Sequence, residues 1–304
     1  MIKSLNKSGL RSHPVFVFLS IFVAAVSRSM ARDVMLFAGG ASYFGMLALF
    51  PAMALGMSVY GLAYSIEDAE AQFARFAGIM PAGAEDFVLE QMGRLANAPI
   101  SALSVNGAIA LAIALFAASR GVKAVIAGLN HLAEDQDIRN VIHFNILAMG
   151  SVLIGGALLT AANLAVLVVP VVLRQVFEFL GLEPLDFGGL INEWTAAAAF
   201  MFVALELLYR MTMRRRSEAV TWRASTFAAF VVTLLWLGLS KGFSAYVAQL
   251  VDFSVYGSLG ALVVFLLWIY WSAYAVFFGG ALAIEIDSRH RARQAESGAE
   301  NQSG

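Results

Sequence analysis

Five long stretches of this chain carry no Asp, Glu, Lys or Arg, and three of them exceed 30 residues. They are residues 34–64, 95–119, 140–173, 224–240 and 253–284. The hydrocarbon core of a bilayer is about 30 Å thick, and about 20 apolar residues in a helix cross it. Hydrophobic residues make up 60% of the chain and charged residues only 13%, which lies outside the usual composition of soluble domains. The sequence therefore predicts a polytopic membrane protein.

Six membrane spans are expected within a single transmembrane domain, residues 34–287. Backbone N–H and C=O groups in lipid must be satisfied internally, so every span should be an α-helix and the fold class all-α. The fourth span has weaker hydropathy because Glu206 and Arg210 interrupt it. The expected spans are residues 36–62, 103–119, 142–173, 194–213, 224–246 and 259–285.

The distribution of Lys and Arg predicts the orientation of these spans. If the chain crosses six times, 16 of its 20 basic residues fall on one side of the membrane. They lie in the N-terminal segment, the second and fourth connections between spans, and the C-terminal tail. Because basic residues are retained on the cytoplasmic side, both termini are expected to be cytoplasmic.

The N-terminal segment, residues 1–33, leaves three alternatives open. Its apolar part, residues 14–27, is short for a span and has basic residues on both sides. This pattern favours a retained helix that lies at the cytoplasmic interface. An additional span is the second alternative, and a cleaved signal peptide is the third.

Two further segments lie outside the spans. Residues 65–100 should lie on the outer face, where apolar residues at helical spacing indicate short amphipathic helices that cap the bundle. A substrate vestibule or a partner surface is the alternative for this loop. The tail, residues 288–304, is polar and lacks apolar periodicity, so it is expected to be a disordered cytoplasmic segment.

Several local patterns occur in a specific order along the spans. They are GGASYFGMLALFPAMALGMSVYGL at 39–62, ASRGVKAVIAGLN at 118–130, Arg139, LLYR at 207–210, and YGSLGALVVFLLWIYWSAYAVFFGGALAIE at 256–285. Together they resemble the YihY/BrkB family, the virulence factor BrkB-like proteins that also carry a ribonuclease BN label. The resemblance covers about residues 14–287 and implies a multi-pass protein of the bacterial inner membrane with six helices and cytoplasmic termini.

The residues for metal or nuclease chemistry are missing from this sequence. A zinc phosphodiesterase needs clustered His and Asp ligands, whereas the four His residues are scattered at 13, 131, 143 and 290. There is no cysteine, and the few basic residues do not indicate a nucleic-acid surface. We therefore expect no enzyme activity, no catalytic residue, no metal, no cofactor and no nucleic-acid partner.

Small residues and one proline suggest close helix packing or a hinge in the first and sixth spans. Pro51 cannot donate a backbone hydrogen bond and should bend the first span. Small residues at helix interfaces let backbones approach closely, which is the simpler explanation. A flexible gate along a translocation path is the alternative. The candidate positions are Pro51, Gly45, Gly56, Gly257, Gly260, Gly279 and Gly280.

Glu206 is the one carboxylate expected inside a span, and Arg210 follows four residues later on the same helical face. A structural pair that reaches the inner interface is one interpretation. The alternative is a carboxylate that couples to a proton or a substrate, because charges inside the membrane are often functional.

A second group of polar residues follows the second span. Arg120, Asn130 and Arg139 match the family pattern and could contact an anionic lipid headgroup. Simple retention of basic residues on the cytoplasmic side is the alternative.

The leading hypothesis is therefore transport, or a flippase-like movement, of a hydrophobic or amphiphilic substrate such as an envelope lipid precursor. The alternative is a membrane scaffold that supports envelope integrity and assembly without transport. The expected partners are membrane lipids, with envelope proteins or a second copy of the chain as further candidates.

Overall fold

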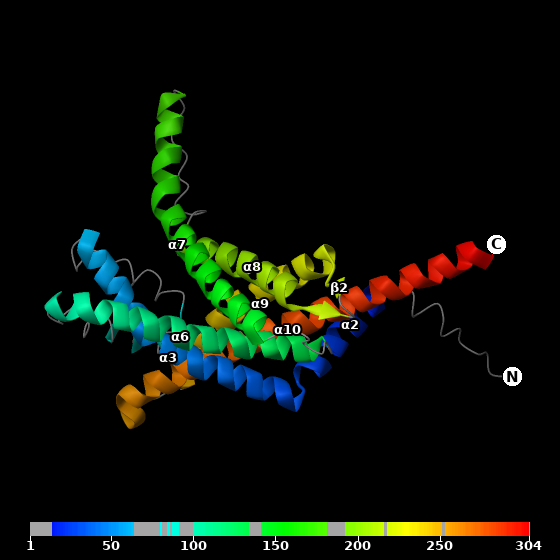
Figure 1. The fold of residues 1–304 in the computed structure, drawn as a ribbon, viewed down its shortest axis with the longest axis horizontal. Helices are drawn as coiled ribbons and strands as arrows, with labels where there is room; N and C mark the ends of the chain where they lie inside the picture. The colour runs from blue at the N-terminus through cyan, green and yellow to red at the C-terminus, as the bar shows by residue number, and fades with distance from the viewer. Residues whose placement is uncertain are drawn as a thin grey trace.

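The computed structural model describes residues 14–63, 80, 84–85, 87–90, 100–133, 141–180, 192–215, 218–250 and 253–303. Within these residues the chain is almost entirely α-helical, which confirms the predicted fold class (Figure 1). The exception in the described part is a short antiparallel hairpin of two strands with two residues each, β1 (Arg214–Arg215) and β2 (Glu218–Ala219). The helices are α2 (Pro14–Ser29), α3 (Arg32–Ala63), α6 (Ile100–Leu132), α7 (Val141–Phe179), α8 (Glu193–Thr212), α9 (Trp222–Leu250) and α10 (Phe253–Ser303).

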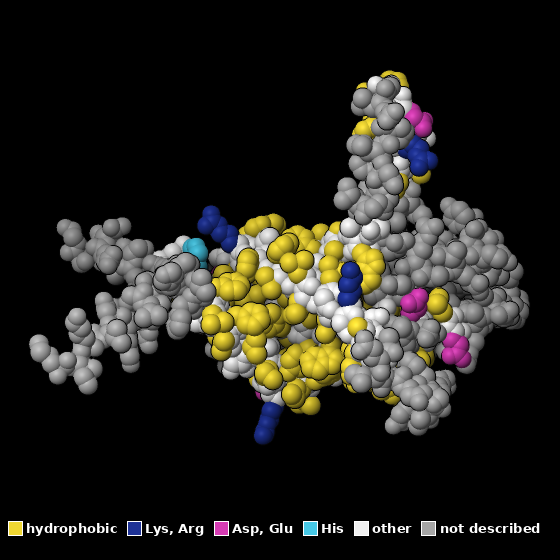
Figure 2. All heavy atoms as spheres, turned by 180° about the vertical axis from the view of Figure 1, so that it is seen from behind, with side chains coloured by type: hydrophobic (Ala, Val, Ile, Leu, Met, Phe, Trp, Pro, Cys, Tyr) yellow, Lys and Arg dark blue, Asp and Glu magenta, His cyan; other side chains and the backbone are white. Residues whose placement is uncertain are grey.

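Six of the described helices are long and apolar enough to cross a membrane, as the sequence predicted. Their outward surfaces carry many exposed Leu, Ile, Val and Phe side chains. Figure 2 shows hydrophobic side chains spread over the middle of one face of the molecule, with few charged side chains among them. Such a surface requires a lipid solvent. The spans are Arg32–Met53, Leu111–Leu132, Val141–Ala162, Trp194–Thr212, Trp222–Val247 and Gly260–Ala292.

The N-terminal helix α2 is too short to count among these spans, and it packs against the helix bundle. The rings of Phe22 and Phe278 are 5.3 Å apart, and Arg289 Nη1 donates a hydrogen bond to Ser20 Oγ at 2.8 Å. On the outward side of α2, Leu19 is 56% exposed. A short apolar helix that contacts the bundle on one side and leaves apolar residues open on the other agrees with the expected interfacial helix.

The polar ends of several helices lie together at one end of the bundle, which we call the basic end. It contains Arg28 of α2 with Arg289 and Arg291 of α10, and the β1–β2 hairpin lies beside them (Figure 1). Arg28 Nη1 donates to the carbonyl of Leu132, the last residue of α6, at 2.8 Å. Arg28 Nη2 also pairs with Glu285 Oε1 at 3.3 Å. One guanidinium therefore joins three helices at this end.

Two clusters of buried residues make the core. The larger cluster lies toward the basic end and joins α2, α3, α6, α8, α9 and α10. The smaller one contains Met53, Val247 and Phe265 together with Ala84, Phe87 and Val88. The rings of Phe87 and Phe265 are 5.6 Å apart. The described part of the segment 65–100 thus packs on the bundle, while most of that segment lies outside the described residues.

The C-terminal tail corrects an expectation from the sequence. Helix α10 continues to Ser303, where residues 288–304 were expected to be disordered. Arg291 Nε pairs with Asp287 Oδ2 at 2.8 Å across one helical turn. Ala, Arg, Gln and Glu are good helix formers, so a helix already nucleated inside the bundle can extend through these residues.

Prolines lie inside two of the helices, Pro51 in α3 and Pro170 in α7. Both helices change direction along their length in Figure 1, and the end of α7 projects away from the other helices. A proline removes one backbone hydrogen bond and clashes with the carbonyl four residues earlier, which accounts for such bends.

Candidate functional site

Glu206 of α8 is buried, with 7% of its surface exposed. Its Oε1 accepts a hydrogen bond of 2.8 Å from Ser225 Oγ, which belongs to the first turn of α9. Its Oε2 is also buried and has no hydrogen-bond partner among the described residues. A buried carboxylate oxygen without a partner is costly, because the charge has lost water without gaining a compensating bond.

Arg210 lies one turn beyond Glu206, in the last turn of α8. Its guanidinium carbon lies 4.3 Å from the centroid of the Trp222 ring, a cation–π contact. Arg210 Nη1 is buried and has no hydrogen-bond acceptor in the part of the chain that the structure describes. No ion pair joins Glu206 to Arg210 in the described part of the chain, although their spacing allows one. The two residues lie close together as expected, but each contacts α9 instead of the other.

The other end of the α8–α9 pair carries a similar contact. Lys241 Nζ of α9 lies 5.1 Å from the centroid of the Trp194 ring, at the start of α8. Each of these two helices therefore supplies one cation and one tryptophan. Tryptophan rings and basic side chains are the usual anchors at the boundaries of a membrane span. The side-chain oxygen of Asn192 caps α8 by accepting from the backbone N–H of Thr195.

Tyr209 joins α8 to α10 at a point that our sequence analysis did not single out. Its side chain is fully buried, and its hydroxyl donates to the carbonyl of Val276 at 2.8 Å. A methyl group on Gly279 would overlap Tyr209 Oη and Val232 Cγ2. The available sequence signals were the Tyr of LLYR and the Gly-Gly pair at 279–280, but nothing in the sequence joined the two.

The candidate glycines differ in what surrounds them. A methyl group on Gly280 would overlap Leu129 Cδ2, whereas one on Gly45 would meet Ile269 Cγ2 at an ordinary 3.6 Å. Gly260 is buried. Gly56 and Gly257 belong to α3 and α10, but their surroundings lie outside the described residues. Gly279 and Gly280 therefore lie at close contacts between helices.

Tryptophan and serine residues form a reciprocal contact between α9 and α10. Trp236 Nε1 donates to Ser272 Oγ at 3.0 Å, and Trp268 Nε1 donates to Ser240 Oγ at 3.2 Å. In each helix the tryptophan precedes its serine by four residues, so two antiparallel helices can exchange the same bond twice. This arrangement satisfies both indole N–H groups inside the apolar bundle.

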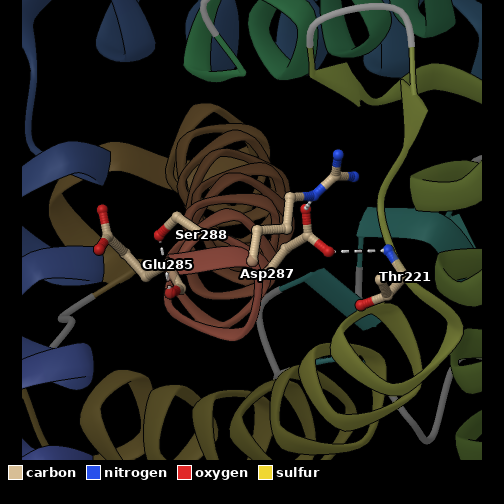
Figure 3. A network of polar contacts seen from close by, with 5 residues as sticks. Thr221, Glu285, Asp287 and Ser288 are labelled. Carbon is tan, nitrogen blue, oxygen red and sulfur yellow. Dashed lines mark hydrogen bonds and ion pairs between the residues drawn. The ribbon is translucent and has the colours of Figure 1, made fainter. Parts of the chain in front are cut away.

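Asp287 is another buried carboxylate, with none of its surface exposed, and both of its oxygens have partners. Oδ1 accepts from the backbone N–H of Thr221 at 3.1 Å, immediately before α9, and Oδ2 accepts from Arg291 Nε at 2.8 Å. Figure 3 shows Asp287 and Glu285 on opposite sides of α10. A carboxylate at the start of a helix is favoured by the helix dipole, which gives Asp287 a structural role.

The described residues contain no group of three or more His, Cys, Asp or Glu side chains that could hold a metal ion. His131 Nε2 lies 3.2 Å from Asp33 Oδ2, and both side chains are about half exposed. This pair joins the end of α6 to the start of α3 and does not form a ligand set.

The family of this chain follows from its match to a family model. The model of the family described as virulence factor BrkB matches residues 25–303. The chain belongs to this family. The resemblance seen in the sequence is therefore confirmed, and the chain is an integral membrane protein of the BrkB family.

Three relatives, all from bacteria, agree with this assignment. A Bacillus subtilis protein called putative ribonuclease-like protein YfkH is 26% identical over 258 residues, which are 82% of this chain and 89% of that protein. A UPF0761 membrane protein of Alkalilimnicola ehrlichii is 28% identical over 83% of this chain and 55% of its own length. A UPF0761 membrane protein of Bordetella petrii is 22% identical over 86% of this chain and 56% of its own length. The chain thus spans about half the length of these two relatives. No solved structure matches the chain.

The residues carried over from the BrkB family pattern do not all lie where the sequence predicted. Arg120 was expected to follow the second span, but α6 continues to Leu132. Arg120 is exposed, and its guanidinium carbon lies 5.1 Å from the centroid of the Phe116 ring, on the same helix. The rise of 1.5 Å per residue separates Arg120 from Asn130 by about 15 Å along α6. Asn130 is buried near the helix end, and Arg139 lies outside the described residues. The helix is longer because residues 121–132 pack against α3 and α10.

Proposed function

We propose that this BrkB-family protein moves an amphiphilic substrate, such as an envelope lipid precursor, across or within the bacterial inner membrane. The observation that supports this proposal is Glu206, a buried carboxylate in a span with one oxygen that has no hydrogen-bond partner. Charged groups inside the membrane are expensive and commonly mark a substrate or ion pathway. Glu206 is proposed as the coupling carboxylate and Arg210 as its companion.

The proposed orientation has the basic end in the cytoplasm. Arg28, Arg289 and Arg291 lie at this end, where α2 and the C-terminal part of α10 meet. Retention of basic residues on the cytoplasmic side supports cytoplasmic termini. The exposed Arg120 remains a candidate headgroup contact partway along α6, and Arg139 a candidate beyond it.

The proposed moving parts are the bent helices rather than the contacts that the glycines of α10 make with α8 and α6. Gly279 and Gly280 are closely covered by Tyr209 and Leu129, and a hinge needs room to move. Pro51 lies inside α3 and is half-buried, so a flexible segment around it is the better candidate for a gate.

Reconstitution into liposomes tests this proposal. Purified full-length protein is inserted into vesicles that contain fluorescent phospholipids, and an impermeant reductant then bleaches the label in the outer leaflet. Transport predicts that the protected half of the fluorescence becomes accessible with protein and stays protected without it. Candidate amphiphilic solutes are tested in the same vesicles. Equal rates with and without protein for all of these probes would contradict the proposal.

A scaffold without transport is the second candidate function. The observation that favours it is the close contact of α8, α9 and α10, through Tyr209 on Gly279 and the reciprocal Trp–Ser bonds. A rigid bundle suits a platform for envelope proteins or for a second copy of the chain. Replacing both Glu206 by Gln and Arg210 by Leu should leave a scaffold phenotype intact, whereas it should abolish the phenotype of a transporter.

Catalysis has no place in this proposal. The ribonuclease-like name belongs to the Bacillus subtilis relative, and hydrolysis of RNA would need poised His or carboxylate groups in a basic groove. Incubation of the purified protein with labelled RNA should therefore leave the RNA intact.

A further inference from the structure

Glu206 and Arg210 are opposite charges one helical turn apart that do not form an ion pair. Glu206 is bound through Oε1 to Ser225, and Arg210 lies over the ring of Trp222. Within the described residues, each of the two keeps one buried polar atom without a partner, Oε2 on Glu206 and Nη1 on Arg210. The structure therefore leaves an acceptor and a donor of opposite charge close together and unused.

We propose that these two atoms bind a zwitterion that carries a primary ammonium group beside an oxyanion, the chemistry of a phosphoethanolamine group. The guanidinium of arginine donates two parallel hydrogen bonds that suit phosphate or carboxylate oxygens. An ammonium group has three N–H donors for the carboxylate oxygen Oε2. One ligand then satisfies both buried charges.

The ammonium must be primary rather than quaternary. A quaternary ammonium has no N–H to donate to Oε2, and it usually binds over an aromatic face. An anionic lipid with no ammonium, such as phosphatidylglycerol, would pair with Arg210 and offer Glu206 only neutral hydroxyl donors, without a compensating positive charge.

Both atoms are buried, so a ligand would have to reach them from the outer surface of α8 and α9. The side chain of Trp222 is 62% exposed, and it forms one side of the cation–π contact. A rotation of Trp222 and Arg210 would open the path to Oε2 without displacing a backbone segment. Tryptophan at the first residue of a span lies at the level of the lipid headgroups, so phosphatidylethanolamine is the source of this chemistry that the position favours.

If the bound zwitterion is taken as the transported substrate, this inference rests on the proposed function. Binding itself is measured without any flux. Full-length protein is placed in phosphatidylcholine nanodiscs that contain equal amounts of phosphatidylethanolamine and phosphatidylglycerol, and the lipids that remain bound are counted by native mass spectrometry. The wild-type protein should retain phosphatidylethanolamine about tenfold over phosphatidylglycerol, the effect of about one charge-assisted hydrogen bond.

Variants separate the contributions of the two charges. Glu206→Gln should reduce the preference to about equal retention, because the charge that favours an ammonium is lost. Arg210→Gln should lower the retention of both lipids, since each carries a phosphate. Lys241→Gln, which removes the cation of the corresponding contact at the other end of α8 and α9, should change nothing.

The outcomes are decisive in each direction. Equal retention of the two lipids by the wild type, or an unchanged preference in folded Glu206→Gln, would overturn the site. Competition by soluble O-phosphoethanolamine would support the site and assign the ligand to a soluble zwitterion instead of a lipid. Binding without flux would contradict the proposed function but support the site. Flux without the lipid preference would support the proposed function but overturn the site.

Discussion

The hydroxyl of Tyr209 donates to the carbonyl of Val276 at 2.8 Å, directly beside a glycine whose missing side chain makes room for the ring. The contact fixes the distance between α8 and α10 at the level where Glu206 and Arg210 face α9. A buried hydroxyl inside a membrane bundle needs an acceptor. The Tyr209 ring occupies the space that a side chain on Gly279 would fill, and there its hydroxyl reaches the carbonyl of Val276.

We therefore expect Gly279→Ala to destabilise the bundle. The added methyl group would overlap Tyr209 Oη and Val232 Cγ2, and inserting a methyl group into a filled core costs about 1–3 kcal/mol. The free energy of unfolding in mixed micelles gives the measurement. Gly238→Ala in α9 is the control, because a methyl group there would meet no atom within 4 Å. Equal stability of the two variants would contradict the packing described.

The reciprocal bonds between α9 and α10 can be tested by a double-mutant cycle. Trp268→Phe and Ser240→Ala each remove one side of the same hydrogen bond. We expect a coupling energy of about 0.6 kcal/mol, the average for hydrogen bonds between membrane helices. Trp236→Phe combined with Ser272→Ala is a poorer pair for the cycle, since Ser272 also bonds to the carbonyl of Trp268. A coupling energy of zero would show that the indole finds another acceptor.

Asp287 should be more important for stability than its position near the end of the last span suggests. Asp287→Ala would leave the N–H of Thr221 and the side chain of Arg291 without this acceptor, at a cost of about 1–3 kcal/mol. Asp287→Asn retains an oxygen for Thr221 and should lose less. Thermal melting of the purified protein measures both. As a control, Asp33→Ala removes a carboxylate that is 59% exposed and should lower the melting temperature much less.

The orientation can be measured cleanly because the natural chain contains no cysteine. Single cysteines are introduced by Ser101→Cys, at the start of α6, and Ser303→Cys, at the end of α10. We expect an impermeant maleimide to label Ser101→Cys in intact spheroplasts and Ser303→Cys only after the membrane is opened. The opposite pattern would reverse the proposed orientation.

The sequence predicted the helices and the membrane environment, because both depend on local composition. Long uncharged stretches such as residues 140–173 require a helix in lipid whatever their neighbours are. The position of Arg120 could not be predicted in this way. A single arginine suggested the end of a span, but contacts with α3 and α10 extend α6 by another 12 residues to Leu132.

The site was only partly accessible from the sequence for the same reason. The charge of Glu206 inside a span and its spacing to Arg210 were visible, and both residues lie where helical geometry puts them. Their partners Ser225 and Trp222 come from the next helix, so they depend on how α8 and α9 pack. Tyr209 and Gly279 are 70 residues apart and meet only in the folded bundle.

The most direct test of the proposed function compares the wild type with Glu206→Gln in vesicles that contain labelled phosphatidylethanolamine. Glutamine keeps the size of the side chain and can still bond to Ser225, so the bundle should remain folded. If Glu206 couples the movement of an amphiphile, the initial rate of lipid movement should fall about tenfold or more, as expected for the loss of one charge-assisted interaction. An unchanged rate, or a wild-type rate equal to that of vesicles without protein, would contradict the account.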